Sequence, residues 1–186
     1  MKYFKKLLGE TIYLSPRSTE DVEKFTEWLN DFEVTDYLSR SSQLVTLEYE
    51  KKYLEEPKKD EVSFAIITIN ESRLIGTVSL MNIDYINRTA TLGIFIGDKE
   101  YRNNGCGTEA IRLILDYGFN YLNLNNIQLE VLEFNERAIK SYKKCGFKEY
   151  GRRRKCKFLN GQYYDVIEMD ILAEELEDSY IKNKEI

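Results

Sequence analysis

The residues best suited to chemistry lie in a polar, glycine-containing segment, Tyr101-Arg102-Asn103-Asn104-Gly105-Cys106-Gly107-Thr108. Its two glycines tolerate positive φ and leave the neighbouring backbone amides uncovered by side chains. A helix is predicted to begin at Gly107, so these amides would lie at the positive end of a helix dipole, where phosphate groups bind well. The Arg102 guanidinium and the Thr108 hydroxyl would add donors. The segment therefore predicts a phosphate-binding turn.

The same glycines fit two other interpretations. Gly105-x-Gly107-x-x-Ala110 matches the dinucleotide fingerprint of an NAD-dependent oxidoreductase, and Glu130 follows at about the expected 20 residues. In that fold a strand runs directly into the first glycine. Here residues 98–104 are polar and three predicted strands precede the turn, so this alternative ranks last. An ordinary strand-to-helix turn without a ligand is the other alternative.

The composition excludes several kinds of catalytic site. The 186 residues contain no histidine, so neither a Ser-His-Asp triad nor an imidazole metal site can form, and we expect no metal. The cysteines Cys106, Cys145 and Cys156 lack CxxC spacing and are interpreted as reduced thiols. No histidine can activate Cys106, which we interpret as a small loop side chain and not as an acyl-enzyme nucleophile.

The charge balance constrains the partners. Lysine and arginine number 27 against 32 aspartates and glutamates, a net charge of −5. This argues against a protein that coats nucleic acid or an anionic membrane, and it suits a cationic partner. The basic run at residues 152–155 is interpreted as a solvated strand face. Without a signal peptide or an apolar span, we expect a cytoplasmic protein.

The elements that must position the glycine-containing turn follow from hydrophobic periodicity. Helices are predicted over 18–30, 47–54, 107–121 and 136–144, with a loop or broken helix over 30–43 and a short peripheral helix after Leu172. Strands are predicted over 62–69, 73–81, 89–96 and 127–132, followed by a hairpin of 147–158 and 162–171 around Asn160-Gly161. Asn135 would cap the helix at 136–144, and Gly146 would end it. This order predicts one domain over 1–186, an α+β fold with helices on the faces of a mixed sheet.

Two motifs resemble the GCN5-related N-acetyltransferase (GNAT) superfamily. Arg102-x-x-Gly105-x-Gly107 resembles its acyl-CoA pyrophosphate loop. Downstream, Asn135-x-x-Ala138-x-x-x-Tyr142-x-x-x-Gly146-Phe147 resembles a second motif of the family, separated from the first by a predicted helix and strand. The opening from Leu14-Ser15-Pro16-Arg17 to Trp28-Leu29-Asn30-Asp31 is similar to the branch of ribosomal-protein N-terminal acetyltransferases and spermidine acetyltransferases.

The resemblance implies a mixed, mostly antiparallel sheet with splayed central strands, and acetyl-CoA as the cofactor. Pantetheine would bind along the exposed edge of the strand at 89–96. Tyr142 occupies the position of the family's general acid, although a tyrosine on that helix face is also often simply packed. The implied cofactor-binding residues are Ile94, Ile96, Arg102, Asn103, Asn104, Gly105, Cys106, Gly107, Thr108 and Asn135.

The acceptor is defined less sharply. The resemblance implies direct acetyl transfer to a primary amine, either a protein N-terminal amine, such as that of a ribosomal protein, or a polyamine. Glu33, Asp36 and Glu168 are candidates for the acceptor site or for a base acting through water. Relatives often form homo-oligomers, and we expect the same here. A non-catalytic acyl-CoA-binding or sensing module on the same fold is the alternative.

Overall fold

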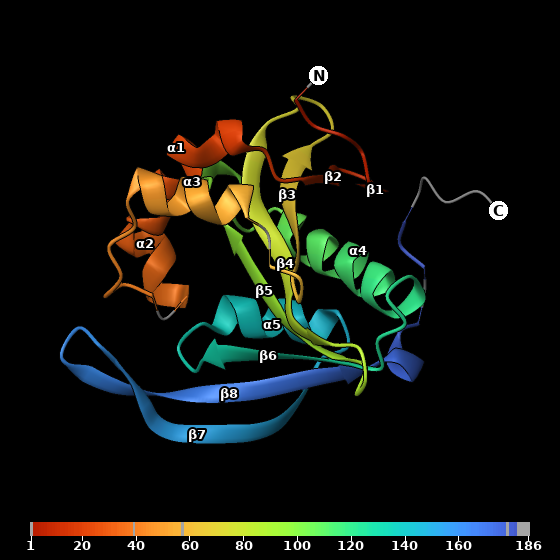
Figure 1. Ribbon diagram of the computed structural model, residues 1–186. Helices are drawn as coiled ribbons and strands as arrows, with labels where there is room; N and C mark the ends of the chain where they lie inside the picture. Colours follow the sequence, from red (N-terminus) through yellow and green to blue (C-terminus); the bar gives the residue numbers. More distant parts are fainter. Residues whose placement is uncertain (1, 39, 57, 178, 182–186) are drawn as a thin grey trace.

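The computed structural model describes residues 2–38, 40–56, 58–177 and 179–181. Within them an eight-stranded sheet has the order β1-β2-β3-β4-β5-β6-β8-β7 (Figure 1). Neighbouring strands are antiparallel except for β5 and β6, which are parallel. This confirms the predicted mixed α+β sheet and excludes the mostly parallel sheet of a dinucleotide-binding fold.

The strands are β1 (Leu7–Leu8), β2 (Ile12–Pro16), β3 (Val62–Thr68), β4 (Leu74–Asp84), β5 (Thr89–Ile96), β6 (Asn126–Leu132), β7 (Lys148–Leu159) and β8 (Gln162–Leu172). The α-helices are α1 (Val22–Leu29), α2 (Phe32–Thr35), α3 (Leu47–Glu55), α4 (Cys106–Asn120) and α5 (Glu136–Lys144). Short 3-10 helices are η1 (Thr19–Asp21), η2 (Asp36–Leu38), η3 (Lys99–Tyr101) and η4 (Ala173–Glu175). In the described part of the chain, no helix is both long and apolar enough to cross a membrane.

The predicted strands and the four longer predicted helices are present, but the expectation that no strand precedes the first helix is wrong. Strands β1 and β2 precede α1. Four of the five residues of β2 are buried, so the strand lacks the alternation of apolar and polar residues that marks a half-exposed strand. The predicted peripheral helix after Leu172 is reduced to the single turn η4 among the described residues.

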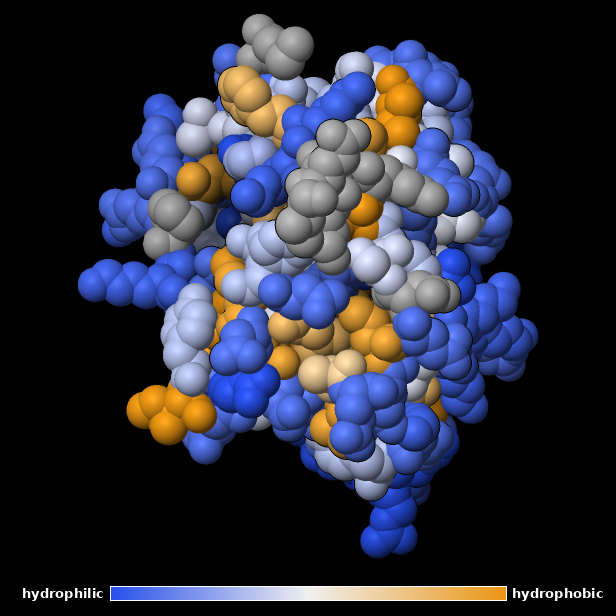
Figure 2. All heavy atoms as spheres, turned by 90° about the vertical axis from the view of Figure 1, so that its right-hand side faces the viewer, coloured by the Kyte–Doolittle hydropathy of each residue, from blue (hydrophilic) through white to orange (hydrophobic). Residues whose placement is uncertain are grey.

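Helices cover both faces of the sheet and define two cores. On β3, Phe64 and Ile66 belong to the core shared with α4, whereas Ala65 and Ile67 belong to the core shared with α1. Figure 1 shows α1, α2 and α3 grouped on one side and α4 and α5 on the other. The outer surface near α4 and the C-terminal segment is mostly hydrophilic with separated apolar patches, as Figure 2 shows, because α4 turns its apolar side onto the sheet.

Two buried or bridging acids fix α4 in place. Near its N-terminus, Glu109 accepts the backbone N–H of Thr11, the residue before β2, at 3.0 Å and so ties the helix to the start of that strand. Near its C-terminal end, fully buried Asp116 accepts the backbone N–H of Ile181 at 3.1 Å and the Ser179 hydroxyl at 2.8 Å. Burial alone would raise the pKa of Asp116, but hydrogen bonds hold it below its usual value. The C-terminal segment is thereby strapped to α4.

Helix α1 packs against the end of β5 closely enough that the residue after the strand, Gly97, has no room for a side chain. A Cβ on Gly97 would lie 2.1 Å from Cδ2 of Trp28. The Trp28 ring packs edge-on against Phe25 and Phe95, with centroids 5.9 and 6.2 Å away. Because the indole is 3% exposed and confined by these rings, it has little room to move.

We expect Gly97→Ala to lower the free energy of unfolding by about 1–3 kcal/mol, the usual cost of overpacking. Urea denaturation followed by tryptophan fluorescence measures this change. Gly107→Ala is the matched control, since its Cβ would lie 3.7 Å from Cγ1 of Ile96, an ordinary contact. Equal stability of the two variants would contradict the close packing of Trp28 on Gly97.

Candidate functional site

Strands β5 and β6 part soon after they begin. Residues 89–91 of β5 pair with residues 126–128 of β6 in parallel register. Beyond them β5 stays paired with β4 up to Ile96, and β6 stays paired with β8 up to Leu132. The backbone edge of residues 92–96 therefore faces a gap in the sheet, which confirms the expected splayed strands.

The gap leads to the turn at the N-terminus of α4. Gly105 precedes the helix with φ of 84°, in the left-handed region that glycine adopts without strain. Apart from Gly105 itself and its two chain neighbours, no atom of the described residues lies within 4 Å of the position that its Cβ would take. The first amides of an α-helix have no intrahelical acceptor. The turn therefore offers N–H donors, an open approach and the positive end of the α4 dipole.

The structure places Arg102 against β5. Its Nε donates to the Ile96 carbonyl at 3.1 Å and its Nη2 to the Gly97 carbonyl at 3.0 Å. Its Nη1 lies 3.5 Å from Oε2 of Glu33. Arg102 thus holds the turn onto the end of β5, and the backbone amides are the donors that the turn presents most directly.

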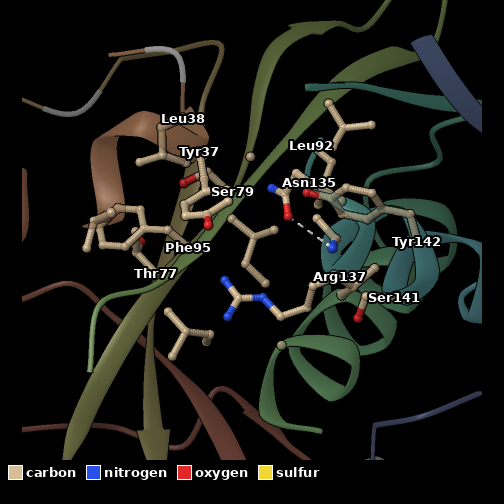
Figure 3. A pocket seen from close by; sticks show the side chains of 18 of the residues that line it. Tyr37, Leu38, Thr77, Ser79, Leu92, Phe95, Asn135, Arg137, Ser141 and Tyr142 are labelled. Atoms are coloured by element: carbon tan, nitrogen blue, oxygen red, sulfur yellow. Dashed lines mark hydrogen bonds between the residues drawn. The ribbon is translucent and has the colours of Figure 1, made fainter. Parts of the chain in front are cut away.

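Asn135 caps α5, as the sequence predicts. Its Oδ1 accepts the backbone N–H of Ala138 at 3.2 Å, and Gly146 ends the helix with φ of 94°. Asn135 is buried at the wall of the cleft. In Figure 3 its amide nitrogen points away from α5. Asn135 can therefore cap the helix and still offer Nδ2 as a donor to a ligand.

Tyr142 lies about two helical turns further along α5 than Asn135 and lines the same cleft. It is 9% exposed and packs edge-on against Phe147, with ring centroids 5.9 Å apart. Among the described residues no hydrogen bond engages its hydroxyl. Burial, with a smaller contribution from Cys145, raises the pKa of Tyr142 to about 12. The phenol is therefore protonated at neutral pH and able to donate a proton.

The other predicted residues of the turn mostly serve to fix it. The hydroxyls of Thr108 and Ser141 lie 2.5 Å apart and join α4 to α5. The Asn104 side chain donates to the Glu100 carbonyl at 2.9 Å. Cys106 is buried and does not line the cleft, and burial raises the pKa of its thiol. A thiol so placed is a poor nucleophile.

The cleft has a volume of about 1030 Å³ and extends from the α4 turn across the gap to α1, η2 and α3. Ile94, Ile96 and Asn103 line it together with the two glycines of the turn. Figure 3 shows Tyr37, Leu38, Thr77, Ser79 and Phe95 on one side and Asn135, Ser141 and Tyr142 on the other. The Arg137 side chain extends between the two sides, with its guanidinium 5.8 Å from the centre of the Tyr37 ring.

The three candidate acids do not form one cluster. Glu33 lines the cleft but is paired with Lys99 at 2.9 Å and lies near Arg102. Asp36 accepts the Ser41 hydroxyl and lines a smaller neighbouring cavity. Glu168 lies on β8, where the Nε of Arg153 is 2.8 Å away. Of the three candidate acids, Glu33 alone lines the cleft.

Several polar residues of the cleft were missed by the sequence analysis, among them Arg137 and Glu50. Arg137 stands within the second motif but was not singled out. Glu50 lines the cleft from α3 and is 3% exposed. A signal for Glu50 exists in the sequence, because Leu47, Glu50 and Leu54 recur at helical spacing. An acid within such a stripe is expected to turn toward the protein interior.

The arrangement fits a ligand with an anionic diphosphate and an extended, amide-bearing arm. The amides of the turn suit the diphosphate, and the open edge of β5 offers backbone groups to the arm as a neighbouring strand would. The volume of the cleft leaves room for a second ligand beside Tyr142.

Known proteins resemble this chain closely. Residues 11–148 match the acetyltransferase (GNAT) domain family. A probable N-acetyltransferase of Bacillus subtilis is 34% identical over 168 residues, which cover 86% of this chain and 92% of that protein. A spermidine N(1)-acetyltransferase of Vibrio cholerae is 41% identical over 102 residues, 55% of this chain and 58% of the other. The solved structure of spermidine N-acetyltransferase from Vibrio cholerae in complex with CoA and spermine superposes with a TM-score of 0.83 at 29% identity, over 90% of this chain and 99% of that one.

The double role of Asn135 is testable through stability. Asn135→Ala removes the acceptor that caps α5 and should cost about 1 kcal/mol in the free energy of unfolding. Asn135→Asp keeps an acceptor in the same place, and its free energy of unfolding should lie within a few tenths of about 1 kcal/mol of the wild-type value. Urea denaturation of both variants checks the difference. Equal losses in the two would show that the amide nitrogen, and not the cap, holds the helix.

Proposed function

The chain belongs to the GNAT acetyltransferase family, and we propose that it acts as one domain that transfers the acetyl group of acetyl-CoA directly to a primary amine. The observation that carries this proposal is the gap between β5 and β6, which joins the amide-rich turn of α4 to the Tyr142 hydroxyl in one cleft. A diphosphate site and a proton donor at its two ends are what transfer from a CoA thioester needs.

Each part of the cofactor has residues suited to hold it. The backbone amides of residues 103–108 would bind the diphosphate, and the edge of β5 near Ile94 and Ile96 would bind the pantetheine arm. Asn135 would donate from Nδ2 to that arm. When bound, acetyl-CoA supplies a thioester carbonyl that is open to nucleophilic attack.

The chemistry assigned to this chain is proton transfer. A neutral amine nitrogen forms a bond to the acetyl carbon, and the bond from that carbon to sulfur breaks. Tyr142 donates its hydroxyl proton to the departing thiolate and regains one from solvent. The buried position and raised pKa of the Cys106 thiol support direct transfer without an acyl-enzyme. Glu33 faces the cleft and is the candidate, among the three acids, for receiving the amine proton through water.

The acceptor and the assembly are proposed from the relatives. The spermidine acetyltransferases support a polyamine, and a putative ribosomal N-acetyltransferase of Bacillus subtilis, 33% identical over 107 residues, supports a protein N-terminus. A dodecameric structure is known for the Vibrio cholerae spermidine acetyltransferase. We propose that this chain also self-associates and that it acts on amines of one of these two kinds.

Cofactor binding is measured by isothermal titration calorimetry. CoA should bind the wild type and raise its melting temperature, whereas NAD should do neither. Asn135→Asp should weaken CoA binding roughly tenfold, because it loses a donor to the arm and gains a charge near it. The stability of this variant serves as its folding control. Absence of CoA binding to the wild type would end the proposal.

The role of Tyr142 is measured by CoA release from acetyl-CoA with spermidine or a peptide as acceptor. Tyr142→Phe should lower kcat roughly 100-fold or more and leave CoA affinity unchanged, since only the proton is lost. Because its pKa is raised to about 12, Tyr142 stays protonated across neutral and mildly alkaline pH and should cause no fall in kcat there. Unchanged kcat in the variant would indicate a packed tyrosine. A wild type that binds CoA but releases none from acetyl-CoA with either acceptor would indicate a non-catalytic acyl-CoA-binding module.

A further inference from the structure

Glu50, a buried acid on α3, lines the cleft. Glu50 is 3% exposed and lines the cleft with Arg17, Arg40 and Tyr53. Among the described residues its carboxylate has no hydrogen-bond or ion-pair partner. The fully enclosed polar side-chain atoms without a hydrogen-bond partner do not include the two carboxylate oxygens of Glu50. Because these oxygens have no partner either, they must be in contact with open space, and the open space beside Glu50 is the cleft. A buried charge in such a position is costly unless a partner arrives to match it.

The nearby cations are not available to match this charge fully. The Nη2 of Arg17 lies 3.6 Å from Glu61, and its guanidinium stacks on the Tyr53 ring at 4.8 Å. Arg40 is exposed and forms no ion pair with Glu50. Both arginines lower the pKa of the Glu50 carboxyl, yet burial outweighs them and leaves it raised.

The other acids near this end of the cleft are already engaged. Glu61 accepts the Tyr53 hydroxyl at 2.6 Å and the Ser63 hydroxyl, besides its contact with Arg17. Glu33 is paired with Lys99. Of the three, Glu50 alone lacks a described hydrogen-bond or ion-pair partner, so it has the most to gain from a cation supplied by a ligand.

The wall beside Glu50 fits the rest of such a ligand. Phe25, Leu29 and Val34 line the cleft on the same side and offer apolar surface. Tyr142 lines the cleft from α5, which Figure 1 shows apart from the group of α1, α2 and α3 that carries these residues. An acceptor that extends from Tyr142 to Glu50 would therefore place a methylene chain on the apolar wall and a second nitrogen at the carboxylate.

We propose that Glu50 binds a second, distal ammonium group of the acceptor, so that this enzyme selects diamines and polyamines over monoamines. The inference rests on the proposed acetylation of amines and narrows its substrate class. Glu50 is assigned to recognition and not to proton transfer, because it lines the cleft from α3, whereas Tyr142 lines it from α5, a helix that Figure 1 shows apart from α3. The selection follows from the loss of a buried, charge-assisted contact when the second nitrogen is absent.

The test compares acceptors that differ in one group. The full chain is assayed for CoA release with spermidine and a series of linear diamines, each paired with the monoamine in which a methyl group replaces the distal amino group. For the best diamine, the wild type should show a KM roughly tenfold or more below that of its paired monoamine. This first measurement needs no variant and therefore does not depend on the folding of a mutant.

The variants then assign the preference to Glu50. Glu50→Gln should raise the diamine KM roughly tenfold and leave kcat and the monoamine KM within about twofold of the wild type. Glu50→Asp keeps the charge and should retain part of the preference. Glu48→Gln removes an exposed carboxylate from the same helix and should change neither KM. CoA affinity should be equal in all of them.

Three results would overturn the inference. They are equal KM values for diamines and monoamines in the wild type, unchanged diamine KM in Glu50→Gln, and a loss of kcat with a shifted pH profile for both acceptors, which would make Glu50 a base. These are distinct from failure of the proposed function, in which the wild type releases no CoA with any amine.

Discussion

The parting of β5 from β6 is the constraint on which the site depends. Three residues of parallel pairing fix the two strands together, and beyond them each strand is held only by its outer neighbour. Unpaired backbone groups inside a sheet are unfavourable unless a ligand or water satisfies them. The gap is therefore both a structural cost and the reason that an amide-bearing arm can bind there. In the proposed function, the turn at α4 and Tyr142 on α5 act on one ligand because the gap connects them.

A gap of this kind needs rigid surroundings, and the packing supplies them. Trp28 presses on Gly97 at the end of β5, and Arg102 ties the following turn to the same strand. At the other end of α4, Asp116 holds the C-terminal segment. These contacts are far apart in the sequence, yet each fixes an element that borders the cleft. The same elements, β5 and α4, therefore both stabilise the fold and border the cleft.

The sequence predicts those parts of the site whose structure is local. Asn135 as a cap and the left-handed Gly105 and Gly146 follow from residue type and neighbouring positions, and all three are as expected. Features that depend on packing between residues far apart in the chain cannot be predicted from the local sequence. The contacts of Arg102 with the carbonyls of Ile96 and Gly97 are one such feature, and its role as a phosphate ligand stays a prediction. Strand β2 is another, since four of its five residues are buried and it shows no alternation of apolar and polar residues.

The net charge of the protein and the position of a single charged residue have different consequences for ligand binding. A net charge of −5 attracts cations to the protein in general. Salt weakens this attraction over a distance of about 10 Å, and the attraction does not distinguish one amine from another. A carboxylate removed from water distinguishes ligands, because a cation that reaches it replaces the missing solvent and an alkyl group cannot. Glu50 is one such carboxylate on the cleft wall, whereas Glu33 at the rim shares its charge with Lys99. Selectivity among amines is therefore expected to depend on the burial of one acid and not on the acidity of the protein.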